Sequence, residues 1–170
     1  MLQIMQILTT VLVAVAMCPA IAHAMEFPGK MRLSREAYLT VQPIYYPGFT
    51  IAGGAAEAGG TIASVVLLLL TPRGTLTFWL TCIAAAGMIG MQIVFWIYTQ
   101  PVNKFWLRNT SGGNLGMDFF AFSPGGRVDD SNAGTDWKTL RDRWEHSHIF
   151  RAGLVFLSFL SLLFAISANN

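Results

Sequence analysis

The chain has 170 residues, of which 54% are hydrophobic and only 12% are charged, and its mean hydropathy is +0.50. These values speak against a soluble domain and favour a membrane protein. The formal net charge of +2 is too small to indicate nucleic-acid binding. The basic residues are better explained by the anionic surface of a membrane.

Four long apolar stretches lie at residues 2–24, 49–70, 76–99 and 149–168. Each is close to the roughly 20 residues that an α-helix needs to cross about 30 Å of hydrocarbon. The sequence therefore predicts an all-α fold. It is a single membrane-spanning four-helix bundle over residues 1–170, with membrane lipid around it and a long cytoplasmic loop between the third and fourth helices.

The positive charges are distributed unevenly between the two sides of these stretches. All but one of the eleven Lys and Arg residues lie between the first and second stretches, between the third and fourth, or just inside the fourth; the exception is Arg73. Because positively charged loops stay in the cytoplasm, both termini are expected on the non-cytoplasmic side. In a bacterium, the protein would lie in the inner membrane.

The first stretch ends in Ala22-His23-Ala24, which resembles a signal-peptidase site. A signal peptide has a positive segment before a short apolar core. Residues 1–17 contain no Lys or Arg, so we expect a retained helix. Cys18 and Cys82 should lie at different membrane depths, too far apart for a disulfide.

A short amphipathic segment is expected on the cytoplasmic side, between the first and second helices. Pro28 and Gly29 predict the end of the first helix. Ser34 then predicts an N-cap for a short amphipathic segment at residues 35–42. We expect this segment at the membrane interface, with three tyrosines at the level of the lipid headgroups: Tyr38, Tyr45 and Tyr46.

Small residues at residues 53–60 and 84–90 predict close approach of the second and third helices to their neighbours. The bulky residues 65–70 are expected to face lipid. In the long loop, residues 109–134 show no helical period, and the apolar residues 117–122 predict a hairpin or a membrane-dipping turn. From Thr135 or Asp136 the pattern is helical again and continues into the fourth helix.

Glu57 is the most deeply placed acidic residue, well inside the second helix. An acidic side chain at that depth costs up to about 3 kcal/mol, so it should face the bundle interior and have a partner. It is either a proton carrier or ligand-binding group, or a paired residue that sets the helix register. Gln92 in the third helix is the next most deeply placed polar residue, and its amide could hydrogen-bond between helices or bind a ligand.

Trp144, His148 and Arg151 share one face of the fourth helix, because they lie at positions i, i+4 and i+7. Glu145 is close enough in sequence to set the tautomer of His148. Arg151 lies one turn deeper and should be paired if buried, with Glu57 or Gln92 as candidates. These residues predict a polar pocket, or alternatively an interfacial cluster that orients the helix.

The three histidines gather at one membrane face. His23 ends the first helix, while His146 and His148 begin the fourth. Histidines from different helices can bind a metal ion or haem. However, His146 and His148 are two residues apart and point to different faces of their helix. No metal or cofactor is expected, and haem or metal binding by these histidines stays an alternative.

The sequence also resembles a membrane family of unassigned function that includes the anthrone oxygenases. Two sets of residues carry the resemblance. The first is 26–30, 33–36 and 38–42. The second is a closing signature of Pro101-Val102-Asn103, Asp136-Trp137, Leu140-Arg141, Arg143-Trp144-Glu145, His148 and Arg151. Residues 104–135 depart from the family pattern as an apparent insertion.

The resemblance implies a four-helix membrane protein that oxygenates a lipophilic aromatic substrate at the cytoplasmic face without an established metal or flavin. It implies His148 as the base, Arg151 as the group that stabilises the enolate, and Trp144 and Asn103 as substrate-binding residues. Glu57 and Gln92 complete the candidate site. The alternative is a non-catalytic subunit of a larger membrane complex, docked through the insertion at residues 104–135.

Overall fold

The computed structural model describes residues 1–45, 48–107 and 136–168, which form helices and no strand. Four segments are long and apolar enough to cross a membrane, so by length and composition the chain is an integral membrane protein. The predicted all-α four-helix bundle is confirmed. Its elements are α1 (Leu2–Lys30), α2 (Arg35–Val41), the 3-10 turn η1 (Gln42–Tyr45), the π-helical turn η2 (Phe49–Gly53), α3 (Gly54–Leu70), α4 (Leu76–Val94), the π-helical turn η3 (Phe95–Thr99), α5 (Gln100–Leu107) and α7 (Trp137–Ser167).

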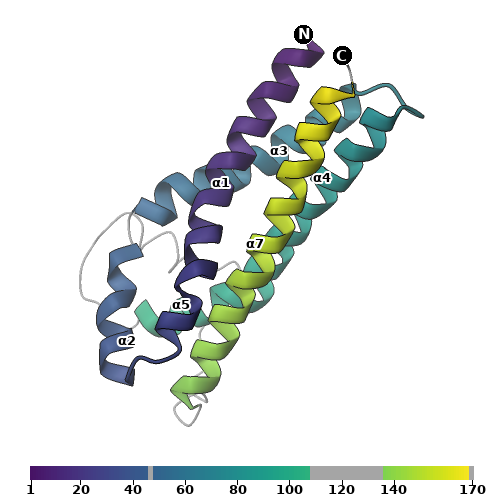
Figure 1. Cartoon of the computed structure of the whole chain (residues 1–170). Helices are drawn as coiled ribbons and strands as arrows, with labels where there is room; N and C mark the ends of the chain where they lie inside the picture. The colour runs from purple at the N-terminus through teal and green to yellow at the C-terminus, as the bar shows by residue number, and fades with distance from the viewer. Residues whose placement is uncertain (46–47, 108–135, 169–170) are drawn as a thin grey trace.

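The long helices run alternately up and down, and the two termini lie at the same end of the bundle (Figure 1). Each of α1, α3, α4 and α7 packs on two of the others, most extensively α4 on α7. We call the half with the termini the terminal end (residues 2–16, 60–87 and 153–168). The opposite half, with α2 and α5, is the polar end (residues 17–45, 48–59, 88–107 and 136–152).

Small residues let the helices approach closely, as predicted. A Cβ atom on Gly87 would overlap the Ser158 side chain of α7, and one on Gly60 would lie 3.5 Å from the Val13 backbone of α1. The Ser158 hydroxyl donates a hydrogen bond to the Ala84 carbonyl across the α4–α7 contact, at 3.0 Å. Such contacts replace the hydrophobic effect that holds helices together in water.

The lipid-facing residues are also largely as predicted, since Leu69 at the end of α3 is 78% exposed, whereas Leu67 in the same run is fully buried. The tight turn before α4 requires a glycine, because Gly74 has a φ of +80°. Cys18 and Cys82 are free thiols.

The helices extend further at the polar end than the sequence indicated. α1 does not end at residue 24 but continues past Pro28 and Gly29 to Lys30. The third long helix does not end at residue 99, because the chain stays helical through Pro101 to Leu107. α7 begins at Trp137, where the Asp136 side chain accepts from the Lys138 backbone N–H.

The amphipathic segment is confirmed as α2, which is capped by a 3.2 Å hydrogen bond from the Ala37 backbone N–H to Ser34 Oγ. The predicted insertion at 104–135 starts within α5, and its remainder lies outside the described residues, together with the expected hairpin at 117–122 and Tyr46.

Candidate functional site

One cavity at the polar end is lined by all six candidate site residues. Its volume is about 160 Å³. Every long helix contributes to its wall, as do both π-helical turns; such turns are frequent at functional sites. The candidate residues on the wall are Glu57, Gln92, Asn103, Trp144, His148 and Arg151, joined by His23.

Glu57 and Arg151 form an ion pair across the cavity wall. Arg151 Nη2 donates to Glu57 Oε1 at 2.5 Å, and the two side chains are 6% and 12% exposed. The predicted pairing of Arg151 is confirmed, with Glu57 rather than Gln92 as the partner. Because a lone charge at this depth is costly, each residue requires the other.

His148 presents a proton-accepting nitrogen to Arg151. His148 Nδ1 lies 2.9 Å from the Trp144 carbonyl oxygen, which can only accept, so Nδ1 carries the proton. Nε2 is then unprotonated and accepts from Arg151 Nη1 at 3.4 Å. The expectation that Glu145 sets this tautomer is wrong, because the Glu145 side chain turns toward Tyr38 and Lys30.

Trp144 is held by Asn103 and packs against His148. Its indole Nε1–H donates to Asn103 Oδ1 at 2.7 Å, and its ring centroid lies 4.0 Å from that of His148. The indole is 2% exposed. Asn103 therefore orients an aromatic wall of the cavity, and this wall in turn supports the imidazole.

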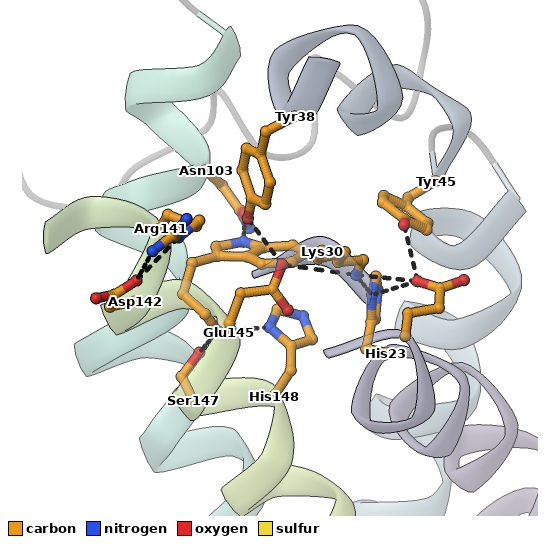
Figure 2. A network of polar contacts seen from close by, with 12 residues as sticks. His23, Lys30, Tyr38, Tyr45, Asn103, Arg141, Asp142, Glu145, Ser147 and His148 are labelled. Carbon is orange, nitrogen blue, oxygen red and sulfur yellow. Dashed lines mark hydrogen bonds and ion pairs between the residues drawn. The ribbon is translucent and has the colours of Figure 1, made fainter. Parts of the chain in front are cut away.

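A second cluster of polar residues lies beside the cavity and was not predicted (Figure 2). Lys30 is 5% exposed, and its ammonium lies 2.9 Å from Glu26 Oε2, 3.0 Å from His23 Nδ1 and 3.7 Å from Glu145 Oε1. An ammonium can only donate, so His23 Nδ1 accepts and its proton lies on Nε2. We call Glu26, Lys30 and Glu145 the ion cluster.

Two tyrosines complete the ion cluster. Tyr38 donates to Glu145 Oε1 at 2.8 Å, and Tyr45 donates to Glu26 Oε2 at 2.7 Å. Both are buried by protein side chains, where their hydroxyls serve the carboxylates of the ion cluster; the expected position at the level of the lipid headgroups stays a prediction. Burial, together with the adjacent carboxylate, raises the pKa of each phenol, so both remain donors.

The helical period of α1 would have revealed the ion cluster if the helix had been expected to continue. His23, Glu26 and Lys30 lie at positions i, i+3 and i+7, and therefore on one face. Pro28 and Gly29 indicated a helix end instead. Proline removes one backbone hydrogen bond, but α1 contains both Pro19 and Pro28 and still continues to Lys30, whose contacts with Glu26 and Glu145 hold the last turn.

The three histidines do not form one site. His146 is exposed, and its Nδ1 lies 2.7 Å from the Asp142 carbonyl. The His23 and His148 ring centroids are 4.4 Å apart. Metal–imidazole bonds are about 2 Å long, so axial ligands on opposite faces of a haem have centroids about 6 Å apart. The pair therefore does not fit a haem between its rings, and the described residues include no group of three or more His, Cys, Asp or Glu placed to hold a metal ion.

The cavity thus combines a neutral imidazole that can accept a proton, a buried guanidinium that can stabilise a negative charge, and aromatic walls. No protein-family model, no curated protein and no solved structure matches the chain.

Proposed function

We propose that the protein is an oxygenase that acts on a lipophilic hydroxyaromatic substrate without a cofactor. The observation that carries this proposal is the convergence of His148, Arg151 and Glu57 on one cavity whose walls are partly aromatic. A base and a neighbouring positive charge are what the deprotonation of a phenol or an activated carbon requires.

In the proposed reaction, Arg151 Nη1 turns from His148 Nε2 to the oxygen of the substrate, which frees Nε2 to accept the substrate proton. Arg151 stabilises the resulting anion, and Glu57 holds Arg151 in place. The electron-rich carbon then reacts directly with O₂. One oxygen atom stays on that carbon, and the other leaves in water together with two hydrogens of the substrate, at least one of them from that carbon. Oxygen is reduced by the substrate itself, so the electrons balance without a further reductant.

The proposal includes an orientation. The uneven distribution of Lys and Arg favours the polar end as the cytoplasmic end, with both termini on the opposite side. Alkaline phosphatase fused to the C-terminus should be active, because it folds only outside the cytoplasm. A fusion within the loop between α5 and α7 should be inactive. The reverse pattern would contradict this orientation.

The chemistry is tested with the full chain in lipid nanodiscs under ¹⁸O₂. Substrates are a hydroxylated anthrone and 2-decyl-1,4-hydroquinone. We expect one labelled atom per molecule of hydroquinone product and no hydrogen peroxide; the anthrone tests whether a three-ring substrate is accepted as well. His148→Ala should lower the rate by 10² to 10⁴-fold, the usual contribution of a general base. His146→Ala is the matched control, because His146 is exposed and lies outside the cavity wall. Peroxide without label, or unchanged turnover in His148→Ala, would refute the mechanism.

A further inference from the structure

The size of the cavity limits the ring system that it can hold. An engineered cavity of about 150 Å³ lined by apolar side chains holds benzene, and this cavity measures about 160 Å³. One six-membered ring with small polar substituents therefore fits, whereas three fused rings exceed the space. The cavity wall is rigid on the side of Trp144, because the indole is hydrogen-bonded to Asn103.

The cavity also has an exposed edge, which lies between α3 and η3. Ala58 of α3 and Trp96 of η3 both line the cavity and are both exposed. Gly54, one turn before Ala58, also lines it, and a Cβ atom there would meet nothing within 4 Å. Both elements belong to membrane-crossing segments, so this edge opens sideways to hydrocarbon.

The inner wall retains an unused hydrogen-bond donor. Arg151 is 5% exposed and lines the cavity. Its Nη2 and Nη1 atoms contact Glu57 and His148, but its Nε–H has no partner among the described residues. A buried donor without a partner costs free energy. Arg151 lines the cavity, but its Nε atom is enclosed, so a phenolic or quinoid oxygen can accept this bond only after the guanidinium turns toward it.

We propose that the cavity takes a single-ring hydroxyaromatic of the hydroquinone class with an apolar tail. The ring passes between α3 and η3 from the hydrocarbon, its oxygen reaches Arg151, and the tail stays in the lipid. This inference rests on the proposed function for its chemistry: the hydroquinone and O₂ give a hydroxylated quinone and water. The phenolic proton goes to His148. A ring carbon forms a bond to O₂, and the O–O bond then breaks as the hydrogen on that carbon leaves with the water.

Binding is tested separately from turnover, in the absence of oxygen, by scintillation proximity with tritiated 2-decyl-1,4-hydroquinone and the full chain in nanodiscs. We expect saturable binding that a hydroxylated anthrone does not displace. Ala58→Trp should weaken it at least tenfold by filling the opening. Ala55→Trp is the matched control: Ala55 is also exposed on α3 but does not line the cavity, so its effect should stay within twofold. If Ala58→Trp does not fold, Gly54→Leu fills the same opening.

Absence of saturable hydroquinone binding, displacement by the anthrone, or equal binding in Ala58→Trp and Ala55→Trp would each overturn the inference. The two proposals fail in different ways. Hydroquinone binding without incorporation of ¹⁸O would refute the oxygenase and leave the ligand class standing. Oxygenation of the anthrone without hydroquinone binding would refute the ligand class and leave the oxygenase standing.

Discussion

The two ends of the bundle satisfy their buried polar groups by different means. At the terminal end, most hydroxyls bond to their own helix: Thr10 donates to the Gln6 carbonyl, Ser64 to Gly60 and Ser161 to Leu157, each at 2.7 or 2.8 Å. Thr9 and Ser158 also donate to carbonyls of neighbouring helices. At the polar end, charged groups find their partners on other elements. Lys30 on α1 lies near Glu145 on α7, and Arg151 on α7 pairs with Glu57 on α3.

This difference indicates where the molecule is built for packing and where for chemistry. A hydroxyl bonded within its own helix is satisfied whatever its neighbours do, so the terminal end depends mainly on the fit of its side chains. Interhelical ion pairs are costly to bury and gain little net stability over apolar packing. Their concentration around a single cavity is therefore better explained by function than by stability.

The largest expected effect at the polar end comes from Lys30→Met. This change leaves the fully buried Glu145 without its cation, and breaking a buried pair in this way costs about 3–5 kcal/mol. Unfolding in mixed micelles should show a loss of this size. Lys138→Met is the control, because Lys138 is exposed near the start of α7. It should change the free energy of unfolding by less than about 0.5 kcal/mol. Equal effects would remove the contrast between the buried cluster and the surface.

Tyr38→Phe removes the donor to Glu145 and should destabilise by about 2 kcal/mol. It should also flatten the pH dependence of stability. Because burial raises the pKa of Tyr38 above its ordinary value of 10.0, the folded state keeps a proton that the unfolded state loses. This contribution is complete below pH 10 and is lost as the pH rises further. Wild-type stability should fall by up to about 1.4 kcal/mol per pH unit for this group, and the variant should lack that component.

At the terminal end, packing sets the cost. The Cβ atom of Gly87→Ala would overlap Ser158 Oγ and lie 3.0 Å from the Leu154 carbonyl. Overpacking of this kind costs about 1.5 kcal/mol. Gly153→Ala is the control, because its Cβ atom would meet nothing within 4 Å. Thermal unfolding should lower the midpoint for Gly87→Ala alone; a similar loss in both variants would point to a backbone effect instead.

The smallest expected effects separate two serines of α7. Ser158→Ala removes a hydrogen bond to α4 and should cost about 0.6 kcal/mol, the usual value for an interhelical bond in a membrane. Ser161→Ala removes only a bond within α7, so it should be nearly neutral. If Ser161→Ala lost more stability than Ser158→Ala, hydrogen bonds within a helix would matter more at the terminal end than those between helices.

Much of the architecture could be predicted because it follows from local rules. The apolar stretches gave four helices, Ser34 and Asp136 gave two helix caps, and the charge of Glu57 and Arg151 predicted a pair. The errors fell where two local signals competed. Pro28 indicated the end of the first helix, and the apolar stretch ending at residue 99 indicated the end of the third. The chain stays helical past both residues, to Lys30 and to Leu107.

The sequence by itself determined the membrane class, the four helices and the face that Trp144, His148 and Arg151 share, because hydropathy and helical period are properties of neighbouring residues. Only the tertiary structure decided that Lys30, Glu145 and the two tyrosines meet beside His23, and that the cavity holds about 160 Å³. Those contacts join residues as far apart as Tyr38 and Glu145. The physical reason is that a buried charge accepts any partner that packing brings within reach, and no local pattern specifies which one.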